Sequence, residues 1–161
     1  MLVTFFTFLH NRVFGGWRKW LAQSFALKEE MVDQYLNIVT EAPLHSVHKL
    51  NALESVRNLS YGSSNQLVMI QGNAMRLLMN EVKQAHHGSE QQTVALATIR
   101  NLCLYPGYRV QAAKELTEML IAVCWAVEND TCKQHALGAL ANLAANERPS
   151  MILLEEDVSN F

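Results

Sequence analysis

The chain has 161 residues, half of them hydrophobic, and a formal net charge of −2 at pH 7. This length and composition suit one folded domain and exclude a disordered chain. Direct binding of nucleic acid is not expected, because it requires a strongly basic surface. The three cysteines, Cys103, Cys124 and Cys132, have no C-x-x-C spacing. We therefore expect small core residues in an intracellular protein rather than a disulfide framework.

The first 27 residues predict two degenerate helices. Apolar and aromatic residues recur there at spacings of three and four, with a break at Gly15-Gly16. The apolar stretch from Met1 to Leu9 has no preceding basic residues and is too short to span a membrane. We expect a buried helix there, not a signal or an anchor.

From Lys28 onward the pattern predicts a series of helices separated by turns. The helix 28–40 should end before Pro43, because the residue before a proline resists helical geometry. Gly72 predicts a sharp turn between the first two helices of its unit. Glu115 takes the place of this glycine in the next unit, so the sequence predicts the turn there less strongly. A partial fourth unit begins at Arg148-Pro149. Between these points we expect helices at 46–61, 65–71, 74–82, 91–104, 108–114, 116–127 and 131–145.

Three similar nine-residue segments organise this series. They are ALESVRNLS at 52–60, ALATIRNLC at 95–103 and ALGALANLA at 136–144, and their asparagines follow one another after 43 and 41 residues. A period of about 40 to 47 residues is typical of helical solenoids. The sequence thus predicts an all-α, right-handed solenoid of about three repeats plus a partial fourth over residues 28–161. HEAT-type helix pairs are the alternative, and an uncapped end would make this a fragment of a longer solenoid.

The pattern A-L-x-x-h-x-N-L and the short, medium, long helix order resemble the armadillo repeat. That resemblance implies that the long third helices line a concave groove, where Asn58, Asn101 and Asn142 grip the backbone of an extended peptide. Amide side chains suit this role because they offer donors and an acceptor. The alternative is that each asparagine bonds the following loop and ends its own helix.

Four neighbours of the asparagines are further candidates for partner binding on the same face. Tyr61 and Leu104 lie one turn after Asn58 and Asn101. Arg57 and Arg100 directly precede these asparagines, and they either pair with acidic groups on a partner or remain solvated.

The position four residues before each asparagine argues against one class of partner. It holds Glu54, Ala97 and Gly138, where the nuclear-import adaptors have tryptophan. We therefore do not expect recognition of a nuclear-localisation peptide.

A narrower resemblance extends over the flanks of the repeats. The segments RNLSY at 57–61, QTVALATIRNLCL at 92–104, NDTCKQ at 129–134 and LANLA at 140–144 are similar to the C-terminal armadillo-like domain of the large ARID-containing, Osa-like subunit of SWI/SNF chromatin remodellers. That resemblance implies a nuclear scaffold that binds core subunits, with the DNA-binding module outside this chain. The alternative is a reversible, catenin-like adaptor for extended peptides, nuclear or cytoplasmic.

Catalytic and metal-site signatures are weak throughout the sequence. The pairs His45 and His48, and His86 and His87, have no cysteine or carboxylate at metal-ligand spacing. The sequence has no phosphate loop, nucleophile elbow or H-E-x-x-H motif. The acidic run Glu155-Glu156-Asp157 is typical of a solvated segment. We therefore expect no enzyme, cofactor, metal or small-molecule substrate, only protein partners.

Overall fold

A computed structural model of the chain describes residues 28–145. The helices predicted within residues 1–27, the partial fourth repeat and the acidic run 155–157 lie outside the described residues. Every regular element in the described part is a helix. No helix of residues 28–145 is long and apolar enough to cross a membrane.

The predicted helices from residue 28 onward are present, with one exception. The pattern predicted separate helices at 108–114 and 116–127, but a short 3-10 turn, η1, leads instead into the single long helix α6. This correction has a local cause: Glu115 favours a helix, whereas the equivalent break at Gly72 is followed by Asn73 in the left-handed conformation. The elements are a helix at 28–41, α2 (Val47–Leu59), α3 (Ser63–Gln71), α4 (Ala74–Gln84), α5 (Glu90–Leu102), η1 (Pro106–Tyr108), α6 (Arg109–Ala126) and α7 (Asp130–Ala144).

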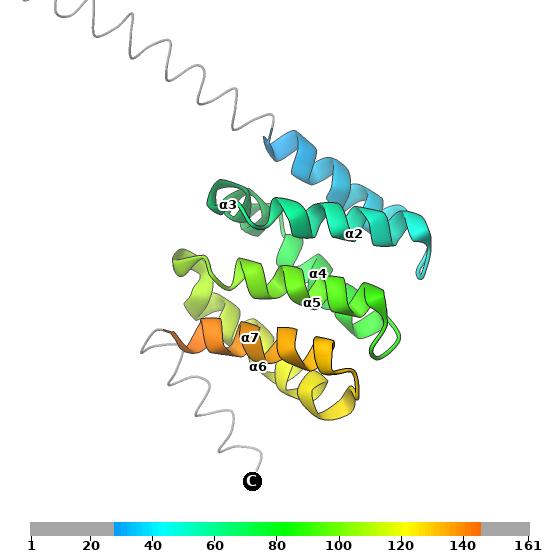
Figure 1. Ribbon diagram of the computed structural model, residues 1–161. Coiled ribbons are helices and arrows are strands. Elements are labelled where there is room, and N and C mark those ends of the chain that lie inside the picture. Colours follow the sequence, from blue (N-terminus) through cyan, green and yellow to red (C-terminus); the bar gives the residue numbers. More distant parts are fainter. Residues whose placement is uncertain (1–27, 146–161) are drawn as a thin grey trace, which may run out of the picture.

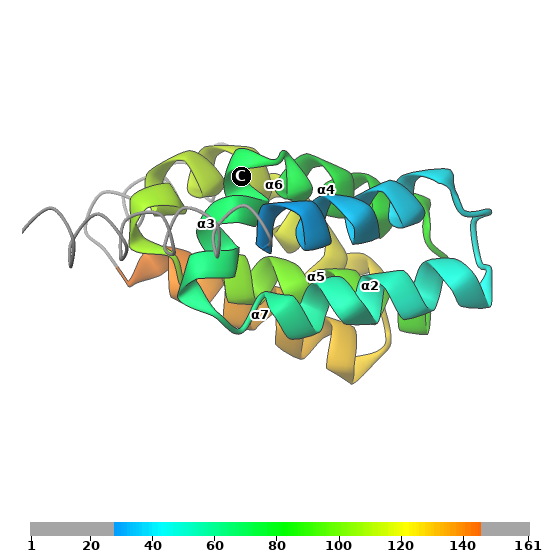
Figure 2. The same cartoon turned by 90° about the horizontal axis from the view of Figure 1, so that it is seen from above.

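The long helices α2, α5 and α7 lie side by side and run in the same direction, as Figure 1 shows. The view from above shows the helix 28–41, α4 and α6 in a second layer (Figure 2). Helix α5 packs against α2 and α7 within the first layer, while α4 packs on α5 and α6 on α7 between the layers. The described chain therefore alternates between two layers of helices.

The core lies between these layers and is formed mainly by aliphatic side chains. Burying one leucine stabilises a fold by about 1.5–3 kcal/mol, so the apolar stripes of the helices hold the layers together. The largest fully buried aliphatic side chains include Leu53, Met69, Leu78, Leu96, Ile99, Leu102, Leu116, Leu120 and Leu143.

Each long helix of the first layer begins at a polar cap. The hydroxyls of Ser46 and Ser89 each accept a hydrogen bond from the backbone N–H three residues later. Asn129 Oδ1 accepts hydrogen bonds from the backbone N–H groups of Thr131 and Cys132. A cap of this kind contributes about 1 kcal/mol. Each of the helices α2, α5 and α7 thus begins directly after its cap residue.

The cysteines are free thiols, and two of them belong to the core. Cys103 and Cys132 are buried, and Cys124 is half-buried. Burial raises the pKa of Cys103 to about 12, so this thiol stays protonated and unreactive. The expectation of small core residues is confirmed for Cys103 and Cys132.

Candidate functional site

Two of the three repeated asparagines tie neighbouring long helices together. Asn101 Nδ2 donates a hydrogen bond to Ser60 Oγ at 2.9 Å, and Asn142 Nδ2 donates to the backbone oxygen of Arg100 at 3.0 Å. The partner in both cases is the end of the preceding long helix, not the following loop. Asn58 is exposed, and its side chain makes no hydrogen bond with any described residue.

Two arginines and one histidine of successive long helices lie within electrostatic range of one another. Arg57 of α2 and Arg100 of α5 both lie close enough to His135 of α7 to perturb its titration. The Arg57 guanidinium has one carboxylate within 4.0 Å among the described residues, that of Glu54. These side chains, with Asn58, Tyr61 and Leu104, define what we call the basic face.

The basic face contains two buried nitrogens without a hydrogen-bond partner among residues 28–145, Arg57 Nε and His135 Nδ1. Burial lowers the pKa of His135, and the charges of Arg100 and Arg57 lower it further. His135 is therefore held in its neutral form beside two permanent cations. An anion placed here would be attracted by both guanidinium groups.

Gly138 makes room for one of these cations. A Cβ atom at this position would lie 2.7 Å from Arg100 Nε, so Arg100 extends across α7 only because residue 138 has no side chain. The equivalent Ala97 is buried and Glu54 is half-buried. Sequence reasoning noted Arg100 and Gly138 separately, and it missed His135, because nothing in the repeat marks that position.

Three large apolar side chains on or directly after the long helices are exposed to solvent. Tyr61 is 70% exposed and Leu104 is 47% exposed, so both predicted candidates are accessible. Leu137 is 57% exposed, although its counterparts Leu53 and Leu96 are fully buried. Within the first layer α5 covers one side of α2, and α7 covers one side of α5. Among the described residues no helix covers the equivalent side of α7.

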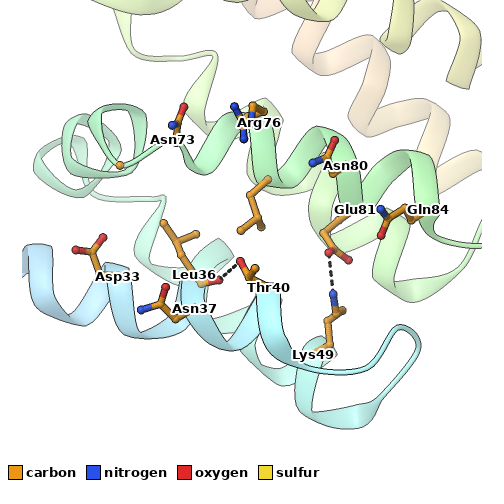
Figure 3. Close-up of a pocket in the computed structure, with 12 residues that line it drawn as sticks. Asp33, Leu36, Asn37, Thr40, Lys49, Asn73, Arg76, Asn80, Glu81 and Gln84 are labelled. Carbon is orange, nitrogen blue, oxygen red and sulfur yellow. Dashed lines mark hydrogen bonds and ion pairs between the residues drawn. The ribbon is translucent and has the colours of Figure 1, made fainter.

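A groove lies in the other layer, between the helix 28–41 and α4. Figure 3 shows this groove, which has a volume of about 380 Å³. Its walls are mostly polar, with Asp33, Asn37 and Thr40 on one side and Asn73, Arg76, Asn80 and Gln84 on the other, and Leu36 and Leu77 add apolar surface. We call it the polar groove.

A buried ion pair closes one end of the polar groove. Lys49 Nζ lies 2.9 Å from Glu81 Oε1, and Gln91 Nε2 donates to Glu81 Oε2 at 2.6 Å. Both charged groups are thus satisfied within the protein, and they join α2, α4 and α5. This arrangement stabilises a particular packing of the helices rather than providing a reactive acid or base.

The predicted histidine pairs are arranged differently in space. His45 stacks on His86, with ring centroids 4.2 Å apart and planes 5° apart. Stacked rings do not converge on a common point, as metal ligands must. Within residues 28–145 no group of three histidine, cysteine or acidic side chains is placed to hold a metal ion.

No protein-family model, curated protein or solved structure matches the chain.

Proposed function

We propose that this chain is a non-enzymatic scaffold that binds an acidic segment of a partner protein on its basic face. The observation that carries the proposal is the convergence of Arg57, Arg100 and His135 with a single carboxylate, Glu54, within 4.0 Å of Arg57. Guanidinium groups bind carboxylates through paired hydrogen bonds. The Arg57 side chain is 32% exposed and Arg100 is exposed, so a partner carboxylate can approach both guanidinium groups from solvent.

The bordering residues suit a protein partner better than a free anion. Exposed Tyr61 and Leu104, each three residues after a repeated asparagine, offer apolar contact area for a protein. Interfaces typically combine arginine and aromatic side chains of this kind at their most stabilising positions.

The proposed architecture is a right-handed, armadillo-like solenoid of about three repeats plus a partial fourth. It is supported by the common direction of α2, α5 and α7 (Figure 1), by the repeated caps at Ser46, Ser89 and Asn129, and by the asparagine ties between neighbouring helices. Exposed Leu137 suits a stack that continues past α7.

The asparagine bonds favour a stable scaffold over a reversible peptide adaptor. An adaptor that grips a peptide backbone needs free amide donors, and Asn101 and Asn142 have each already committed one of their two amide N–H groups to the preceding helix. The segments similar to the Osa-like subunit make core subunits of a nuclear SWI/SNF remodeller the first partners to test. The catenin-like adaptor is the second candidate, favoured only by the exposed, unbonded Asn58.

Site-specific photocrosslinking tests the proposal. A photoreactive residue replaces Tyr61 on the basic face, or exposed Gln111 on α6 as a positional control, and the chain is incubated with nuclear and cytosolic extracts. The variant Arg57→Glu/Arg100→Glu is compared with Arg76→Glu/Lys114→Glu, which changes the net charge equally elsewhere on the surface.

We expect crosslinks from position 61 to acidic segments of remodeller subunits, lost in the Arg57/Arg100 variant and retained in the control variant. Crosslinks that persist after both arginines are reversed would contradict binding at the basic face. Cytosolic peptides whose capture depends on Asn58 would identify the adaptor instead.

A further inference from the structure

Figure 2 shows α4 and α6 in the layer opposite the basic face, and an apolar groove opens between these two helices. The two helices pack on different partners, α4 on α5 and α6 on α7, and are not closely packed on each other. The resulting groove has a volume of about 450 Å³. Met79 and Val82 line it from α4 and Met119, Ala122 and Val123 from α6, while the polar side chains of His87 and Gln92 complete the lining.

The rims of this apolar groove carry opposite charges. Lys83 borders it from α4 and Glu118 from α6, and both are exposed. Neither forms an ion pair within the described residues. Glu115, further along the same rim, already accepts hydrogen bonds from Tyr108 and Gln111. The groove therefore presents one free cation on one rim and one free anion on the other.

Trp125 of α6 is 86% exposed and directly precedes Ala126, which lines the groove. It follows Glu118 by seven residues, which places both on the same side of α6. Exposed tryptophan is unfavourable in water and is enriched among the residues that dominate binding energy in protein interfaces. A large aromatic side chain next to an apolar floor is a feature of docking surfaces rather than of solvated helix faces.

We propose that this groove binds an amphipathic α-helix of a partner protein. The groove lining extends along α6 from Glu115 to Ala126, about 16 Å at 1.5 Å per residue, which matches three helical turns. Apolar side chains at i, i+3 or i+4, and i+7 of the partner contact the methionine-rich floor, whose flexible side chains adapt to their shape. A basic partner residue faces Glu118 and an acidic one faces Lys83.

This site is independent of the basic face, because the two lie in different layers. The polar groove occupies the preceding gap in this layer, between the helix 28–41 and α4, and its walls carry asparagine and threonine. The apolar lining between α4 and α6 is therefore specific to that groove. A scaffold with both sites holds an acidic segment on one side and a helix on the other.

Selection from a library of displayed helical peptides tests the proposal with the full chain as bait. The library randomises apolar positions and places both charge orders on the flanks. Ala122→Glu puts a charge in the groove. The control Ala141→Glu makes the same substitution at an exposed position of α7, outside the groove. Circular dichroism melts verify that both variants fold.

We expect the selected peptides to share a helical apolar stripe with opposite charges on its two flanks. Their affinity should fall at least tenfold with Ala122→Glu and with Trp125→Ala, and stay unchanged with Ala141→Glu. The swap Lys83→Glu/Glu118→Lys should favour the reverse charge order.

Three results would overturn the proposal. One is recovery of no peptide, or of peptides without helical spacing. Another is equal binding to wild type and Ala122→Glu. The third is a dimer in sedimentation that disappears with Trp125→Ala, which would make a second copy of this chain the occupant.

Discussion

Arg100 extends across Gly138 of the neighbouring helix, so closely that a Cβ atom at position 138 would lie 2.7 Å from the Arg100 Nε. This contact holds one of the two arginines of the basic face in place. It links residues 38 positions apart in sequence, and only the packing of α5 on α7 brings them together.

The substitution Gly138→Ala should separate stability from binding. Alanine favours a helix interior by up to about 1 kcal/mol over glycine, and the displaced atoms belong to a flexible arginine side chain. We therefore expect the free energy of unfolding to stay equal or rise by about that amount, while affinity for the acidic partner falls because Arg100 moves. Urea unfolding and a binding titration measure the two effects. A fall in stability with unchanged binding would contradict this account.

The three asparagines should differ in their contribution to stability. Asn101→Ala and Asn142→Ala each remove a hydrogen bond to the preceding helix and should lower the free energy of unfolding by about 1 kcal/mol. Asn58→Ala removes no such bond within the described structure and should change it by less than about 0.5 kcal/mol. Thermal melts of the three variants compare them directly. Equal effects at all three positions would argue against the ties described above.

The buried ion pair should be strongly coupled. Lys49→Met leaves the Glu81 carboxylate buried with only Gln91 as its partner, and should lower the free energy of unfolding by about 3–5 kcal/mol. The double variant Lys49→Met/Glu81→Leu should cost less than the single one, because no unpaired charge remains. Exposed Lys114→Met serves as the control. A double-mutant cycle with no coupling would show that Lys49 and Glu81 act separately.

His135 should make the protein less stable in mild acid. Burial, with Arg100 and Arg57 nearby, holds its folded-state pKa below the ordinary value of 6.5. As the pH falls through 6.5, His135 of the unfolded chain binds a proton that the folded protein does not bind. The free energy of unfolding therefore decreases as the pH falls from 6.5 to the lower folded-state pKa of His135. Urea unfolding between about pH 7.5 and pH 5 should show a steeper decline for wild type than for His135→Gln. Parallel declines would exclude His135 as the cause.

The fold was more predictable than the candidate site. Helix positions follow from apolar spacing and from local signals such as the caps at Ser46 and Ser89, which act within a few residues. The error at 108–127 arose because the repeat suggested a break that Glu115 does not support. Arg57 and Arg100 were recognisable from their place beside the repeated asparagines. His135 was not, because its role depends on cations of two other helices.

The sequence by itself predicted most of the helices to within a few residues, apart from the break at 108–127, because helix formation depends on interactions within one or two turns. Only the tertiary structure decided what the repeated side chains contact. It directs Asn101 and Asn142 to the preceding helix, places Arg100 over Gly138, and separates α4 from α6 to open an apolar groove. These contacts join residues of different helices, and their geometry depends on how whole helices pack, which no local pattern specifies.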